Sequence, residues 1–195
     1  EPIFENKFVC TSFGFRPGRG CKDALSQVEG LMRAGYSWAV DADLKSYFES
    51  IPHDRLVKEV SKYISDSRVL GLIEGFLNQP ILEDLSLWTP EKGAPQGAVV
   101  SPLLSNIYLH EVDKAMKMAG YEMVRCADDF VILCKSQQEA ASALAMVTEL
   151  TRERGLTLHG DKTSLVDTGQ AGQGFDFLGY HFKNGTRWPR KKSLK

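Results

Sequence analysis

The chain has 195 residues, of which 43% are hydrophobic and 25% are charged, and its formal net charge is −1 at pH 7. This composition fits one globular domain with a sizeable core, and the sequence contains neither an apolar run of membrane-spanning length nor a signal-peptide pattern. The four cysteines (Cys10, Cys21, Cys126 and Cys134) have no CxxC spacing, which argues against a zinc site or a disulfide framework and favours reduced thiols in a cytoplasmic protein.

The first predicted elements are a turn, a helix and a strand. Residues 13–20, FGFRPGRG, form a Gly/Pro turn that carries two arginines. Residues 22–34 predict a helix because their apolar residues fall on one stripe. Residues 36–44 alternate, which predicts a strand with one packed face and one face of small or acidic residues. That second face holds Ser37, Ala39, Asp41 and Asp43.

The rest of the chain alternates helices with short strands. The predicted helices cover residues 54–64, 66–78, 101–119 and 136–154. The predicted extended segments cover residues 80–90, 121–127, 130–135, 156–159, 163–167 and 175–182. From the strand at 36–44 onward, the main elements follow the order β-α-β-β-α-β, with the helices at 54–78 as an insertion. This order predicts an α+β fold of the split βαβ type, an antiparallel sheet with helices on one face, and it leaves the other face free for a site.

Carboxylates are expected to meet on that free face. Asp43 lies near the end of its strand, and Asp128 lies with Asp129 at the tip of a predicted hairpin beside it. A plain Asp-rich turn is the alternative, since Asp favours turns. Converging carboxylates without a basic neighbour repel each other unless a cation neutralises them, and hard oxygen ligands select Mg²⁺ or Mn²⁺. We therefore expect a metal-dependent enzyme of nucleotidyl transfer.

The C-terminal residues 183–195 are strongly basic. This segment has six basic residues and no acidic residue, and it includes Trp188. Such a segment suits contact with nucleic-acid phosphates, and a solvated terminus is the alternative.

Six motifs resemble those of one enzyme family. They are FGFRPGRGCKDAL (13–25), DADLKSYFESIPH (41–53), GAPQGAVVSPLLSNIYLHEVD (93–113), RCADDFVIL (125–133), GLTLHGDKT (155–163) and FLGYHF (177–182). In this order the chain resembles a bacterial group II intron reverse transcriptase, also called a maturase. The resemblance implies part of the fingers at 1–35, the reverse transcriptase palm at 36–182 and the start of the thumb at 183–195.

The resemblance also implies roles for particular residues. Asp43 and Asp128 correspond to the metal-binding aspartates, Asp129 to the neighbouring acid, and the Leu44 carbonyl to a contact with the nucleotide-side ion, with two Mg²⁺ ions (or Mn²⁺) as cofactor. Lys162 corresponds to a proton donor for the leaving pyrophosphate, with an ordinary surface lysine as the alternative.

Four further positions correspond to nucleotide-binding residues of the family. Phe48 matches the steric gate that selects dNTPs, and Gln96 and Gly97 match the loop that packs on the nucleotide and template. Arg16 matches the finger arginine that grips the triphosphate. The alternatives are a core aromatic for Phe48, a helix-leading loop for Gln96 and Gly97, and a solvated turn arginine for Arg16.

Two positions depart from the family pattern. Cys126 stands where the family usually has Tyr, which removes a contact to the primer-end base pair, and Ala98 replaces a glycine. Neither change affects the expected metal ligands.

The implied function is RNA-directed DNA polymerisation, with an RNA template or intron RNA, a DNA primer and dNTPs as partners and no membrane. The alternatives are a maturase that binds intron RNA without polymerisation, or a retron, diversity-generating or CRISPR-associated reverse transcriptase.

Overall fold

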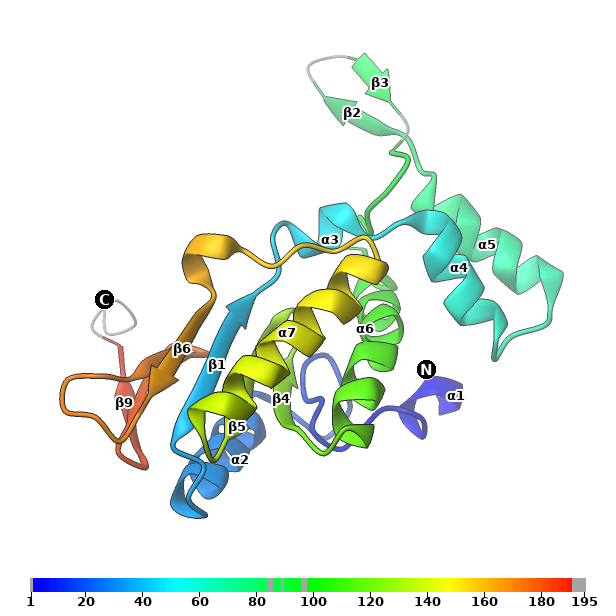
Figure 1. Ribbon diagram of the computed structural model, residues 1–195. Helices are drawn as coiled ribbons and strands as arrows, with labels where there is room; N and C mark the ends of the chain where they lie inside the picture. The colour runs from blue at the N-terminus through cyan, green and yellow to red at the C-terminus, as the bar shows by residue number, and fades with distance from the viewer. Residues whose placement is uncertain (1, 84–85, 89, 96–97, 191–195) are drawn as a thin grey trace.

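The centre of the molecule is a four-stranded antiparallel sheet. A computed structural model describes residues 2–83, 86–88, 90–95 and 98–190. The strands are β1 (Trp38–Asp43), β4 (Glu122–Cys126), β5 (Asp129–Cys134) and β6 (Ser164–Asp167), in the order β4-β5-β1-β6. The register pairs Asp43 with Asp129 at the end of β1. The predicted α+β fold with a split βαβ arrangement is thus confirmed, with the first strand and the Asp hairpin adjacent at the centre (Figure 1).

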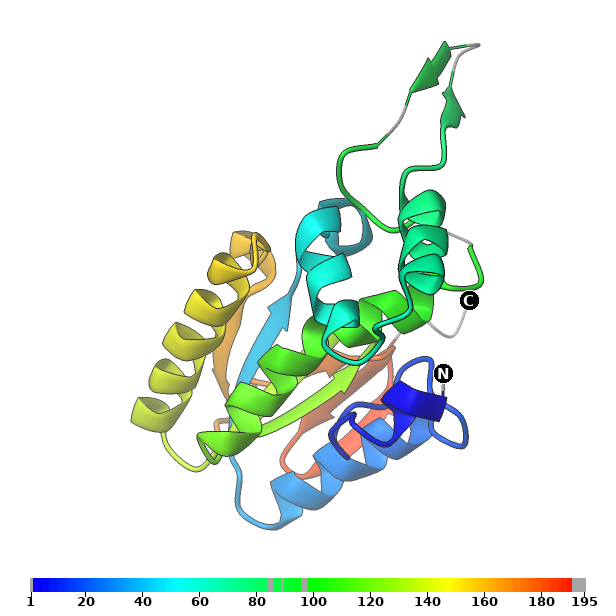
Figure 2. The same cartoon turned by 90° about the vertical axis from the view of Figure 1, so that its right-hand side faces the viewer.

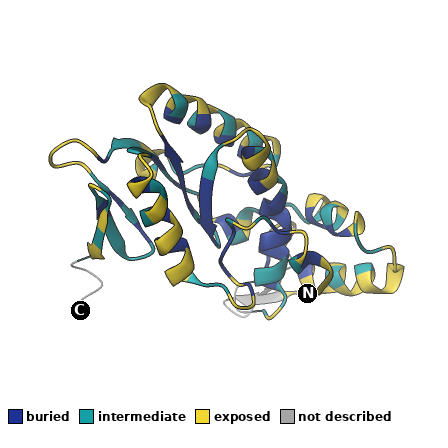
Figure 3. Ribbon diagram, turned by 90° about the horizontal axis from the view of Figure 1, so that it is seen from below, coloured by how far each residue is buried: buried dark blue, intermediate teal, exposed yellow. Residues whose placement is uncertain are grey.

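Two long helices cover one face of this sheet. Helices α6 (Ser101–Met118) and α7 (Gln137–Glu153) lie side by side over the strands (Figures 1 and 2). Their buried residues share a core with the sheet residues that point toward them, Val40, Ala42, Phe130 and Ile132. In Figure 3 the strands are mostly buried and the helices are exposed on their outward sides, as amphipathic elements around one core require.

The opposite face is covered over most of its length, which corrects the expectation of a free face. Helix α2 (Cys21–Arg33) and a second sheet of β7 (Phe175–Phe177), β8 (Tyr180–Lys183) and β9 (Thr186–Pro189) pack there. The reason is that β1 and β5 present apolar residues on this side, Ala39, Val131 and Leu133. Only the end of this face that carries the aspartates remains open.

The C-terminal strands form a hairpin where a single strand over 175–182 was expected. The chain turns at Leu178 and Gly179, whose φ angles are 48° and 81°. Strand β9 then pairs with β8, so part of the basic segment lies in a sheet. The boundaries of fingers, palm and thumb within the chain remain predictions.

The remaining elements flank the central sheet. Helices α4 (His53–Ser61) and α5 (Ser67–Leu77) form the predicted insertion, and the short helix α3 (Tyr47–Ser50) before them was not predicted. A small hairpin of β2 (Ile81–Glu83) and β3 (Ser86–Trp88) follows and projects away from the sheet (Figure 1). The chain begins with α1 (Pro2–Glu5), and a 3₁₀ turn at Gly160–Lys162 precedes β6. Within the described residues, no helix is both long enough and apolar enough to cross a membrane.

Candidate active site

Four aspartates meet at the open end of the sheet. Asp43 ends β1 and lies opposite Asp129, the first residue of β5. Asp128 occupies the tight turn between β4 and β5, where Ala127 has a φ of 64°. Asp41 precedes Asp43 by two positions, so the alternation of the strand places both side chains on one face. The structure thus brings together aspartates from segments far apart in the sequence.

These aspartates line an open cavity of about 650 Å³. Its walls are formed by Asp41, Asp43, Asp128, Asp129, Asp161, Lys162, Ser164, Asp176 and Arg190. The set contains more carboxylates than cations, and all its side-chain donors to a metal would be oxygens. Oxygen donors are the ligand type that Mg²⁺ and Mn²⁺ prefer. As the side chains are placed here, however, no three His, Cys, Asp or Glu residues of the described part of the chain form a group that could hold a metal ion.

Burial and mutual repulsion disfavour the ionised forms of two of these aspartates, as their pKa values show. Burial raises the pKa of Asp41 to about 7, and the charge of Asp129 adds to the effect. Burial likewise raises the pKa of Asp129 to about 6, with Asp43 and Asp128 contributing further repulsion. A bound cation would offset both costs, because it favours the ionised carboxylates.

Two basic side chains at the cavity wall each pair with a carboxylate. Lys162 Nζ lies 2.6 Å from Asp43 Oδ2, and this hydrogen bond raises the pKa of Lys162. The backbone holds this pair together, since the His159 N–H donates to the Asp43 carbonyl at 2.7 Å. Arg190 Nε lies 3.0 Å from Asp176 Oδ2. The lysine therefore already offsets part of the negative charge of Asp43.

Five residues of this cavity were not singled out from the sequence. Asp41 could have been selected, because the alternation of its strand places it on the face of Asp43. The others come from the 3₁₀ turn, from β6, from β7 and from the residue after β9, and nothing in the local sequence pattern shows that these positions meet β1. These residues are Asp161, Ser164, Asp176 and Arg190.

The residues that follow β1 are held by the α3 segment. The Leu44 side chain is buried in the core, and Leu44 forms a bridge with Leu158. Phe48 is half-buried, packs edge-to-face on Tyr47 at 5.4 Å, and accepts a hydrogen bond at its carbonyl from Ala94 N. Phe48 therefore lies beside the loop that leads to Gln96 and Gly97, which are outside the described residues.

Arg16 is buried in a network of its own. Its guanidinium lies 2.7 Å from a Glu5 carboxylate oxygen and donates to the Val9 and Ser12 carbonyls. In this structure the Arg16 side chain holds the N-terminal segment together and is not solvated. The alternative interpretation of Arg16 as a solvated turn arginine is therefore wrong. Binding of a triphosphate by Arg16 stays a prediction. For that role the guanidinium would have to leave Glu5 and the Val9 and Ser12 carbonyls and bind phosphate oxygens instead.

The hairpin that carries Asp128 is anchored from behind by Arg125. This fully buried side chain pairs with Asp113 of α6 at 2.6 Å and donates to Asn106, Ser12 and the Ala127 carbonyl. The contact with Ala127 fixes the turn next to Asp128. Sequence reasoning did not identify Arg125, although a charge inside an apolar strand signals a buried partner.

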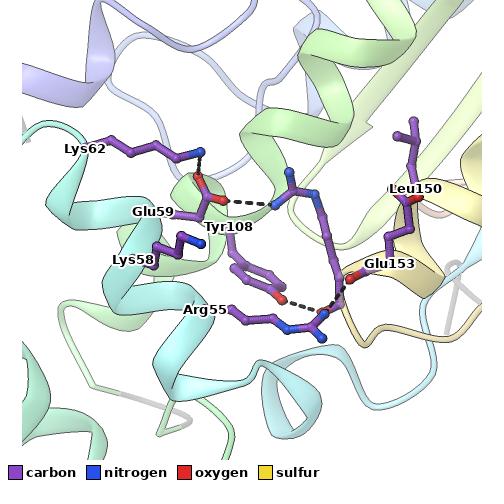
Figure 4. Close-up of a pocket in the computed structure, with 8 residues that line it drawn as sticks. Arg55, Lys58, Glu59, Lys62, Tyr108, Leu150 and Glu153 are labelled. Carbon is purple, nitrogen blue, oxygen red and sulfur yellow. Dashed lines mark hydrogen bonds and ion pairs between the residues drawn. The ribbon is translucent and has the colours of Figure 1, made fainter.

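A second cavity lies between α4, α6 and α7. It measures about 360 Å³ and is lined by Arg55, Lys58, Glu59, Lys62, Tyr108, Leu150, Glu153 and Arg154. Figure 4 shows Glu59 reaching Lys62, and the two are joined at 2.5 Å, with Arg154 at 3.3 Å on the other carboxylate oxygen. Glu59 is thus matched by two cations, whereas in the cavity at the end of β1 the carboxylates outnumber the cations.

The amino-acid sequence is similar to that of several known proteins. Residues 1–182 match the family described as reverse transcriptase (RNA-dependent DNA polymerase). The group II intron-encoded protein LtrA of Lactococcus lactis subsp. cremoris is 40% identical over 114 residues, covering 58% of this chain and 19% of LtrA. Protein YkfC of Escherichia coli K12 is 31% identical over 219 residues, covering 92% of this chain and 57% of YkfC. The chain thus spans less than two thirds of the length of either relative.

Solved structures show the same fold at low sequence identity. A telomerase from Candida albicans, in complex with a TWJ fragment of telomeric RNA, matches with a TM-score of 0.73 at 12% identity, covering 95% of this chain and 36% of the telomerase chain. An apo telomerase from Candida tropicalis matches with a TM-score of 0.71 at 12% identity, over 92% of this chain and 41% of that one.

Proposed function

The chain belongs to the reverse transcriptase family, and on that premise we propose that it supplies the catalytic palm of a group II intron RNA-directed DNA polymerase. The observation that carries this proposal is the pairing of Asp43 with Asp129 on adjacent strands, with Asp128 in the turn between. The substrates are dNTPs, joined to the 3′-hydroxyl of a DNA primer along an RNA template.

Asp43, Asp128 and Asp129 are the residues that would hold two Mg²⁺ ions, or Mn²⁺, with the Leu44 carbonyl as a further ligand. Bound metal would supply charge stabilisation at the attacking and leaving oxygens of an in-line phosphoryl displacement. The protein contributes a rigid carboxylate platform, since β1 is held on both edges by β5 and β6. Catalysis of this kind depends on positioning and charge neutralisation more than on covalent chemistry.

Lys162 is the proposed proton donor to the leaving pyrophosphate. Its ammonium group is exposed and bound to Asp43, and the hydrogen bond favours its protonated form. A cation that binds Asp43 would compete with Lys162 for the same carboxylate. The lysine would then be released, still protonated, beside the reacting phosphates.

The proposed nucleotide-binding roles rest on the resemblance of these positions to the family motifs. Phe48 is the second residue of α3 and lies beside the 93–95 loop, and a ring there would leave no room for a 2′-hydroxyl. Gln96 and Gly97 would pack on the base pair, and Arg16 would grip the triphosphate after releasing Glu5.

Primer extension with purified protein tests the metal site. We expect Asp43→Asn and Asp128→Asn each to lower dNTP incorporation by at least about 100-fold, because each removes a charged ligand from the site of charge development. Asp54→Asn, which changes an exposed aspartate in α4, is the matched control and should retain activity. Near-wild-type incorporation by either active-site variant, with circular dichroism showing a native fold, would refute the proposal.

The preference for dNTPs over rNTPs tests the proposed role of Phe48 as a steric gate. Phe48→Ala should admit rNTPs, seen as a fall in the ratio of kcat/KM for dNTP over rNTP. A ratio unchanged from that of the wild type would remove Phe48 from the nucleotide site and leave it as a core aromatic.

A further inference from the structure

Two cysteines far apart in the sequence lie side by side next to the candidate active site. Cys21 Sγ and Cys126 Sγ are 3.5 Å apart, although 105 positions separate the residues. Cys21 is exposed as the first residue of α2, and Cys126 is buried at the end of β4. Cys126 is also the position that departs from the Tyr usual in the resembled family.

The other two cysteines have different surroundings. Cys10 is exposed, and its sulfur lies 3.6 Å from Lys117 Nζ. Cys134 is buried in the core on the α6 and α7 side of the sheet, whereas Cys126 belongs to the core on the α2 side. The sheet therefore separates Cys134 from the pair.

The geometry allows a bond after a small movement. A disulfide has an S–S distance of about 2.05 Å, so the two sulfurs must approach by about 1.5 Å. Cys126 is held by the pairing of β4 with β5, so Cys21 has to move. The segment before it has room, because a side chain added at Gly18 or Gly20 would meet nothing within 4 Å.

We propose that Cys21 and Cys126 form a reversible disulfide that ties the start of α2 to the strand beside Asp129. The oxidant is a low-molecular-weight disulfide. The Cys21 thiol loses its proton and attacks one sulfur of the oxidant, which releases one thiol and leaves a mixed disulfide on Cys21. The Cys126 thiol then loses its proton, attacks Cys21 Sγ and releases the second thiol. The protein loses two electrons and two protons, and the oxidant gains both as it becomes two thiols.

Exposure decides the order of the two steps. Cys21 is accessible to an oxidant, whereas the Cys126 thiol is buried. Cys126 is therefore a poor first nucleophile. It acts second, when the sulfur it attacks is already adjacent and the reaction is intramolecular.

The bond would act on the hairpin that carries the aspartates. Cys126 lies directly opposite Asp129 in the β4–β5 register, on the same face of the sheet. The disulfide would tether the strand end that precedes Asp128 to the displaced start of α2 and would restrain the hairpin. This effect on catalysis rests on the proposed polymerase function, whereas the bond itself does not.

Thiol mapping tests the bond without reference to activity. Native protein is incubated with glutathione disulfide, free thiols are alkylated, and the peptides are identified by mass spectrometry. We expect a cross-linked peptide pair containing Cys21 and Cys126 in the wild type and in Cys10→Ser, reversed by dithiothreitol. Cys21→Ser should leave Cys126 alkylated. Glutathione retained on Cys21 with Cys126 free, or a cross-link dominated by Cys10, would overturn the proposal.

Primer extension on the same samples tests the consequence. Oxidised wild type should lose activity several-fold, dithiothreitol should restore it, and Cys21→Ser should show no change on oxidation. A cross-linked protein with full activity would overturn the effect on catalysis. If the reduced protein lacks polymerase activity, the proposed function fails, and the mapped cross-link alone then decides whether the disulfide stands.

Discussion

The two faces of the β4–β5 hairpin differ in how their charged side chains are paired. On the α6 side, Arg125 and Asp113 pair at 2.6 Å with side-chain exposures of 0% and 3%. On the other side, Asp41, Asp43 and Asp129 share an open cavity in which carboxylates outnumber cations. Buried charges persist in proteins when they are paired, so the first face is structural. The second face keeps an excess of negative charge, which costs stability unless a cation is bound, and this difference supports its proposed role as the catalytic face.

The largest effect on stability is expected from removing the ion pair between Arg125 and Asp113. Asp113→Ala should lower the free energy of unfolding by about 3–5 kcal/mol, because it leaves the Arg125 guanidinium buried without its counter-ion. Lys114→Ala changes an exposed residue on the same helix and should alter it by less than about 0.5 kcal/mol. Urea denaturation at pH 7 measures both. A loss under 1 kcal/mol for Asp113→Ala would mean that the pair is not what anchors the hairpin.

A smaller effect on stability is expected at Gly14, in the loop that packs against the turn of the β4–β5 hairpin. The Gly14 carbonyl accepts from Asn106, and a Cβ at Gly14 would lie 2.2 Å from the Ala127 backbone nitrogen. Gly14→Ala should therefore destabilise the protein by about 1–3 kcal/mol, because backbone must move. The control is Gly20→Ala, whose added Cβ meets nothing within 4 Å. Thermal unfolding followed by circular dichroism compares the two, and equal melting temperatures would contradict the close approach.

The smallest effect, with opposite sign, is expected on the carboxylate face. Asp41→Asn should raise the free energy of unfolding by about 1 kcal/mol at pH 8 in EDTA, because it removes one charge from a repelling cluster. Added Mg²⁺ should reduce this gain, since the ion favours the wild-type charge. Urea denaturation with and without Mg²⁺ measures the change. Destabilisation in EDTA would show that Asp41 is held by favourable contacts, and the contrast between the two faces would be lost.

The sequence predicted the elements that deliver the aspartates better than the packing around them. Alternation in residues 36–44 and a hairpin at the Asp pair were enough to place Asp43 beside the hairpin, because both patterns are local. The Leu178–Gly179 turn was missed, since Leu in a left-handed conformation has no sequence signal. The cover provided by α2 and β7–β9 was missed with it.

Long-range polar partners were the other limit. Arg16 was selected from its motif, but its contact with Glu5 depends on α1, where no element was predicted. Arg125 and Asp113 lie on different elements, and no spacing rule connects them. Charge pairing across elements depends on tertiary structure, which is why Asp176 and Arg190 were also absent from the expected site.

The pairing of β1 has a consequence for synthesis of the protein. This central strand ends at Asp43, but its partner strands begin at Asp129 and Ser164. At about 5–20 residues per second, a ribosome exposes β1 for several seconds before either partner emerges. During that interval both edges of a strand with one apolar face are open to other chains, so we expect nascent molecules to need chaperone protection until translation has passed β6.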